Sequence, residues 1–168
     1  MAGDKYIYNN AGTLTEKAAT QSSAGAGDAG KVVALNASGE VDITMMPTGI
    51  GADTASVEAS ENLAAGDFVN IYNDSGAKCR KADATTAGKQ AHGFVLAGVT
   101  SGANATIYFE GTNTQVTGAT AGTVFLSATA GTFTSTAPLA AGNVIQRIGV
   151  ATSATTINVE VGQPIVLA

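Results

Sequence analysis

From about Gly51 to the C-terminus, short segments rich in Val, Ile, Thr and Phe alternate with Gly, Asn, Asp and Pro. β-Branched and aromatic residues fit a pleated sheet, whereas the intervening residues favour tight turns. We therefore expect an all-β fold over 51–168, a compact antiparallel β-sandwich or barrel with a jelly roll among the candidate topologies. The expected strands are 55–60, 68–73, 78–82, 91–99, 105–110, 123–127, 131–135, 144–151 and 156–161.

Three turn sequences are specific enough to predict local structure. The segment 73–76 (Asn-Asp-Ser-Gly) divides two expected strands and tolerates a left-handed backbone, which predicts a tight hairpin. The sequence Ala-Thr-Ala-Gly-Thr occurs at 119–123 and 128–132, each time before a Phe, and predicts a second hairpin. Leu-Ala-Ala-Gly occurs at 63–66 and 139–142 and leads into a strand both times, so we expect two equivalent turns.

Small side chains dominate the whole chain. It has 21 Gly, no Trp and only 12% charged residues. Helices would need the Leu, Glu, Lys and Arg that are scarce here, so the composition also favours strands. A length of 168 residues suits one ordinary domain with an extension, and we do not expect a two-domain enzyme.

Residues 1–50 lack the strand-and-turn pattern and predict an extended N-terminal arm. Within them, 5–8 has the composition of a short strand, whereas 9–30 is a polar tract with no period of 2 or 3.6 residues. Two apolar clusters follow, at 32–35 and 41–46, and neither is long enough to bury itself.

A segment with spaced apolar side chains and no core of its own orders against a partner surface. The alternative is a flexible leader. If the segment is a binding arm, its candidate contact residues are Tyr6, Ile7, Tyr8, Val32, Val33, Leu35, Ile43, Met45 and Met46.

The charge distribution argues against nucleic acid as a partner and in favour of self-association. The net charge is −5, and the basic residues are scattered singly rather than gathered in a stripe. After Glu110 the only charged side chains are Arg147 and Glu160, so the strand edges there lack the charges that keep β-proteins monomeric. We expect a homo-oligomer.

Two features bear on the compartment. No apolar run approaches the roughly 20 residues that cross a bilayer, so we expect no membrane partner. Cys79 is the only cysteine, and the start of the sequence has no basic region followed by an apolar stretch. Both observations predict synthesis in a reducing cytoplasm.

The motifs that could carry chemistry lack the neighbouring elements or partner residues that such sites need. The segment 25–30 fits the dinucleotide fingerprint, but it neither follows a strand pattern nor opens a helix pattern. One His and one Cys cannot provide a zinc site, and His92 is a lone base without a nucleophile motif. Paired carboxylates could still hydrolyse a glycoside, although aromatic residues that stack on sugars are few. We expect no cofactor, no metal and no enzymatic activity.

Several segments resemble one family, the capsid cement (head decoration) proteins of tailed phages. Residues 30–42 (Gly-Lys-Val-Val-Ala-Leu-Asn-Ala-Ser-Gly-Glu-Val-Asp) and 47–51 are similar to the N-terminal part of these proteins. The segments that resemble their β-domain are 63–72, 80–84, 91–95, 105–112 and 146–150.

The resemblance implies a structural virion protein, made in the cytoplasm of a bacterial host. Such a protein would bind the outer capsid surface as a dimer or trimer and clamp neighbouring subunits of the major capsid protein. It implies no catalytic residues. Related β-modules occur in head fibres and tail fibres, so the alternative is a fibre module that binds a receptor or carbohydrate.

Overall fold

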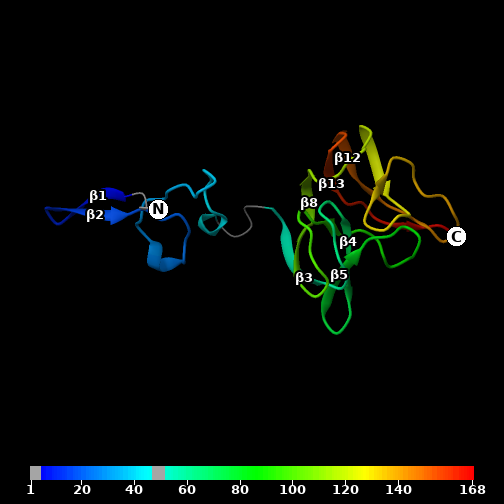
Figure 1. The fold of residues 1–168 in the computed structure, drawn as a ribbon, viewed down its shortest axis with the longest axis horizontal. Helices are drawn as coiled ribbons and strands as arrows, with labels where there is room; N and C mark the ends of the chain where they lie inside the picture. Colours follow the sequence, from blue (N-terminus) through cyan, green and yellow to red (C-terminus); the bar gives the residue numbers. More distant parts are fainter. Residues whose placement is uncertain (1–4, 47–51) are drawn as a thin grey trace. The chain divides into compact units, whose positions relative to one another are not determined.

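The computed structural model describes residues 5–46 and 52–168 (Figure 1). Contacts within the chain divide it into two compact units, 1–51 and 52–168, which we call the N-terminal unit and the β-domain. Apart from two three-residue 3-10 helices, all regular structure in the described residues is β-strand. The predicted all-β fold class is confirmed. That the N-terminal unit serves as an arm stays a prediction.

The N-terminal unit begins with an antiparallel hairpin of β1 (Lys5–Asn10) and β2 (Thr13–Ala18). The 3-10 helices η1 (Ala26–Asp28) and η2 (Ile43–Met45) lie farther along the chain. The strand expected at the start is therefore present, and it is longer than the sequence pattern indicated.

Strand β2 corrects the expectation of an irregular tract over 9–30. Ala11 and Gly12 form a two-residue turn with φ of 50° and 94°, the positive values that a type I′ hairpin turn requires. The Gly12 amide donates to Asn9 Oδ1 at 2.8 Å, which fixes the turn. The hairpin depends on this turn and on cross-strand pairs rather than on alternating burial, so hydrophobic periodicity misses it.

The first half of the β-domain is a small closed barrel with strand order β3-β5-β4-β6-β7. Strands β3 and β5 pair in parallel, whereas the other neighbours are antiparallel. This pair departs from the expected antiparallel arrangement, because a closed ring of five strands cannot alternate direction all the way round. The barrel strands are β3 (Thr54–Ala59), β4 (Phe68–Asn73), β5 (Ala77–Lys81), β6 (Gly93–Phe94) and β7 (Asn104–Tyr108).

The second half of the β-domain is a five-stranded antiparallel sheet with order β10-β9-β12-β13-β8. A separate two-stranded ribbon pairs β11 (Val144–Ile145) with β14 (Ile165–Val166). In Figure 1 the barrel strands β3, β4 and β5 lie in one half of the domain, and β12 and β13 lie in the other. The sheet strands are β8 (Glu110–Asn113), β9 (Gly122–Leu126), β10 (Phe133–Thr134), β12 (Arg147–Ser153) and β13 (Thr156–Glu160).

Both predicted hairpins are confirmed. Asn73 pairs with Ala77 across a turn in which Ser75 and Gly76 have φ of 54° and 135°. The smaller hairpin joins β9 to β10.

The two Leu-Ala-Ala-Gly segments form the same turn, as expected. Asp67 N donates to Ala64 O at 3.2 Å, and Asn143 N donates to Ala140 O at 3.0 Å. The intervening Gly66 and Gly142 are left-handed, so β4 and β11 are entered through matching turns.

Three expected strands are interrupted. Of 91–99, only Gly93 and Phe94 are strand residues, because the chain then leaves β6 and Val95 N bonds to Asp67 O. The expected strand 105–110 ends at Tyr108, and the chain passes from the barrel into the sheet. The expected strand 144–151 is broken at Gln146, whose buried side chain bonds to backbone elsewhere.

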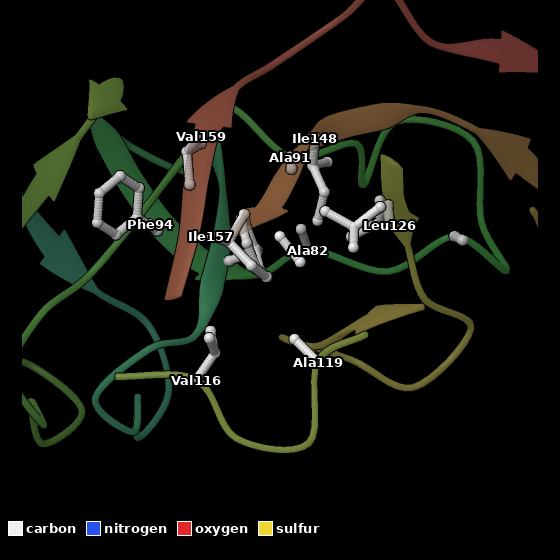
Figure 2. Close-up of a cluster of buried hydrophobic side chains, with 13 residues drawn as sticks. Ala82, Ala91, Phe94, Val116, Ala119, Leu126, Ile148, Ile157 and Val159 are labelled. Atoms are coloured by element: carbon white, nitrogen blue, oxygen red, sulfur yellow. The ribbon is translucent and has the colours of Figure 1, made fainter. Parts of the chain in front are cut away.

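The main core lies between the barrel and the five-stranded sheet. Figure 2 shows Phe94 from the barrel at one end of this cluster, near Val159, with Ile157 in the middle and Ile148 and Leu126 at the other end. The residues between them are small, including Ala82 and Ala91, so the two layers approach closely. Side chains of this kind stabilise a fold by roughly 1.5 to 3 kcal/mol each when fully buried.

A second buried cluster lies in the barrel and includes Cys79, Val57 and Ile107. Cys79 is fully buried, and burial raises the pKa of its thiol. Cys79 is therefore a packed residue of strand β5.

The barrel tolerates no side chain at Gly93. A Cβ there would lie 2.3 Å from Tyr108 O and 2.9 Å from Ile107 Cγ2. We expect Gly93→Ala to lower the free energy of unfolding by about 1 to 3 kcal/mol or more, because backbone must shift. Gly98→Ala is the matched control, since its Cβ would meet Leu63 O at an ordinary 3.6 Å. Urea unfolding followed by circular dichroism checks both, and equal midpoints would contradict the prediction.

Candidate functional site

The N-terminal unit contains no buried residue among 5–46, whereas the β-domain holds both buried clusters. The large apolar side chains of the N-terminal unit are mostly exposed to solvent instead. The exposed ones are Ile7, Tyr8, Leu14, Val32, Val33, Leu35, Val41, Ile43 and Met46. This exposed apolar set is the candidate site, because large apolar side chains left uncovered within their own unit mark a surface for binding.

Polar contacts hold the N-terminal unit together in place of a core. Thr20 N donates to Val32 O, and Ala34 N donates to Thr20 O, both at 2.9 Å, so these two segments run side by side in parallel. Asn36 Oδ1 accepts the amides of Ser38 and Glu40 and closes a turn. Backbone polar groups are thereby paired while the apolar side chains of the same segments stay free.

Two carboxylates fix the short helices of this unit. Asp42 caps η2 and accepts hydrogen bonds from the Thr44 hydroxyl and amide, which lower the pKa of the Asp42 carboxyl. Asp28 pairs with Lys31 and accepts the Ala24 amide, and these contacts lower its pKa. Both carboxylates are therefore ionised at neutral pH and have structural partners.

The hairpin presents two different faces. In the β1–β2 register, Ile7 lies opposite Glu16 and Leu14 lies opposite Asn9, so Ile7 and Leu14 share one face. These two side chains are 66% and 73% exposed. Tyr6 and Tyr8 lie on the other face, where the Lys17 ammonium sits 4.9 Å from the Tyr8 ring. Both faces could contact a partner.

Seven of the nine predicted contact residues are exposed, namely all but Tyr6 and Met45, which are half-buried. Met45 lines a hollow of about 190 Å³ together with Thr20, Lys31 and Val33. Sequence reasoning missed Leu14, the one large apolar side chain in the tract called polar.

The segment 25–30 does not form a dinucleotide site. Gly25 precedes the three-residue helix η1, and no strand comes directly before it. A helix of one turn cannot present the aligned amides that hold a pyrophosphate. Among the described residues, no three His, Cys, Asp or Glu side chains are arranged to hold a metal ion.

A hollow of about 480 Å³ in the β-domain has the charged or ionisable residues His92, Glu110 and Glu160 in its lining. His92 Nδ1 accepts the Ile71 amide at 2.9 Å, so the neutral ring carries its proton on Nε2. Burial lowers the pKa of His92. His92 therefore lies beside strand β4, which accepts its backbone amide and donates to its ring.

The half-buried, neutral His92 predicts a pH-dependent stability. Its folded-state pKa lies below the unfolded value of about 6.5, so acid favours the unfolded chain. Stability is full above about pH 6.5 and declines as the pH falls through the folded-state pKa. We expect the urea midpoint to drop between pH 7.5 and 5.5, a range above the titration of Asp28 and Asp42.

His92→Asn is the matched variant, because the Asn carbonyl can accept the Ile71 amide without taking up a proton. Its midpoint should change less over the same pH range. A wild-type midpoint that stays constant or rises toward pH 5.5 would contradict the assignment.

The lack of a core predicts low hydrogen-exchange protection in the N-terminal unit of the free protein. Even the bonded amides of Thr20 and Ala34 should exchange quickly, because no buried side chains cover them. The amides of Ala59 and Val95, bonded within the β-domain, should be strongly protected. Equal protection in the two units would mean that the N-terminal unit is already covered in the free protein.

Helices long and apolar enough to cross a membrane are absent from the described part of the chain. Comparison with protein-family models, with curated proteins and with solved structures finds no match in any of the three. The function must therefore be inferred from the sequence and geometry of this chain.

Proposed function

We propose that this chain is a structural protein of a tailed-phage virion that binds the outer surface of the capsid. It stabilises the shell by clamping neighbouring subunits of the major capsid protein, without catalysis. The observation that carries the proposal is the N-terminal unit, in which the backbone is internally bonded while the apolar side chains lie uncovered.

The energetics favour a partner surface for this unit. Covering an exposed Val, Leu or Ile side chain contributes roughly 1.5 to 3 kcal/mol. Val33, Leu35 and Ile43 together could contribute several kcal/mol, even after the cost of ordering the unit is subtracted. A hairpin without a packed face gains little from remaining alone in water.

The β-domain fits the role of a rigid body that holds such a clamp in place. Its core is closed, and after Glu110 it carries only Arg147 and Glu160 as charged side chains. A surface so poor in charge favours self-association, as a dimer or trimer. Several linked N-terminal units would bind a repetitive shell with higher avidity than one.

A second candidate function is a head-fibre or tail-fibre module that binds carbohydrate. It is favoured by the hollow around His92, where Gln90, Glu110, Glu160 and the Phe109 ring supply hydrogen-bonding groups and an apolar wall. Saccharide binding that is lost in Glu110→Gln, together with no capsid occupancy, would support this candidate over the first.

Replacing Val33, Leu35 and Ile43 together with Ser should detach the protein from capsids of the virus that encodes it. Because three covered side chains are lost, we expect at least a tenfold weaker affinity, measured as occupancy on purified capsids. Circular dichroism and thermal melting of the free variant should match wild type. Capsids carrying the variant should also lose resistance to heat.

The matched control is Thr15→Ser with Gln21→Ser, which changes two exposed polar residues of the same unit and should leave occupancy unchanged. Full capsid occupancy by the folded variant with Ser at positions 33, 35 and 43 would overturn the proposal. Collapse of the β-domain melting transition would show that these side chains belong to its core, and the division of roles between the units would then be wrong.

A further inference from the structure

Two of the three exposed large apolar side chains of the β-domain form strand β14, and the third, Leu139, lies off that strand. Leu139 is 74% exposed, Ile165 is 62% exposed and Val166 is 55% exposed. Leu139 precedes the turn into β11, and Ile165 and Val166 are the two residues of β14. The other large apolar side chains of the domain are buried or half-buried.

The outer edge of β14 is open for backbone pairing. The ribbon has two strands, and β14 has a strand neighbour on one side only. Leu167 N donates to Asn143 O at 2.9 Å, so the pair of Val144 and Val166 is the non-hydrogen-bonded one. The N–H and C=O of Val166 therefore point away from β11. One residue presents both a donor and an acceptor on this edge.

Nothing protects this edge from pairing. There is no charged side chain in 161–168 or in 136–146, and Pro164 lies before the strand rather than in it. Monomeric β-proteins normally guard such an edge with charge, Pro or a bulge. A two-stranded ribbon is also marginal by itself in water and is stabilised by further strands.

We propose that β14 pairs antiparallel with β14 of a second copy of this chain, across a twofold axis at Val166. Each Val166 N–H donates to the C=O of the other Val166, and the two ribbons become one four-stranded sheet. Ile165 of each copy then lies opposite Leu167 of the other. This inference specifies the self-association that forms part of the proposed function, and it sets the stoichiometry at two.

Two arguments favour a second copy over an unrelated protein. A residue that offers one donor and one acceptor on the same edge is complementary to itself under twofold rotation. Two copies also carry −5 each, so they approach most easily through an uncharged surface, and the ribbon is such a surface. An unrelated partner would gain no comparable advantage from the missing charges.

Sedimentation velocity at roughly 1 to 100 μM, the range of ordinary reversible interfaces, tests the proposal. The full chain should be a dimer. Val166→Pro removes the outward N–H without touching a bond to β11, and Ile165→Lys places a charge at the edge. Both should raise the dimer dissociation constant at least tenfold.

Leu139→Lys is the matched control, because Leu139 is exposed nearby but not on the strand edge. It should leave the dissociation constant within about threefold of wild type, since its side chain lies outside the paired strands. Thermal melting checks that each variant is folded. If Val166→Pro unfolds, Ile165→Lys remains decisive. A wild-type monomer or trimer, or equal effects of Leu139→Lys and Ile165→Lys, would overturn the proposal.

Capsid occupancy separates this inference from the proposed function. A dimer that is broken by Ile165→Lys but never binds capsids would support the β14 interface and contradict the capsid role. Capsid binding by a wild-type protein that is monomeric in solution would support the capsid role and contradict the β14 interface.

Discussion

The side chain of Gln146 ties together backbone groups from separate parts of the β-domain, beside the core that the barrel and the sheet share. Its Oε1 accepts the Ala91 amide at 2.8 Å, and its Nε2 donates to the carbonyls of Ala91 and Gly162 at 3.0 Å. Ala91 leads into the barrel, Gly162 follows the sheet, and Gln146 itself lies between the ribbon strand β11 and β12. Each buried group would cost roughly 1 to 3 kcal/mol if left unpaired, so this one amide helps to fix how barrel, sheet and ribbon are arranged.

The N-terminal unit has no comparable centre. Its hydrogen bonds are exposed and mostly join neighbouring segments, and its ion pairs, Lys5 with Glu16 and Lys31 with Asp28, lie at the surface, where such pairs contribute little. The two units are therefore stabilised by different kinds of interaction. One is closed by buried amides and apolar layers, while the other keeps its apolar side chains available. This contrast favours a division between a scaffold and a binding element.

Turn chemistry and β-propensity were sufficient to predict the fold class and several elements. The strand 68–73 and the turn at 73–76 could be predicted, because Gly, Asn and Asp determine backbone conformation locally. The break at Gln146 could not, because a polar residue inside an apolar run gives no sign that distant backbone groups will satisfy it. The parallel pair of β3 and β5 follows from closing an odd ring, which is a property of the whole barrel.

The same reasoning explains the candidate site. Apolar clusters without a core identified most of the exposed side chains, since exposure follows from the absence of anything to pack against. Leu14 was missed because a hairpin fixed by a two-residue turn brings it beside Ile7. The half-buried state of Tyr6 and Met45 depends on local folding that periodicity does not describe.

The hydrogen bonds of Gln146 also limit how early the β-domain can fold during synthesis. The Gln146 partners Ala91 and Gly162 lie 55 and 16 residues away, and strand β3 must wait for Tyr108 before it can pair fully with β7. Contacts so distant in sequence form slowly, because long loops must close before any bond is gained. A ribosome must therefore release nearly the entire β-domain before it can close. Until then the strands without a local hairpin partner, such as β3, stay unpaired, which leaves their edges open to association with other chains.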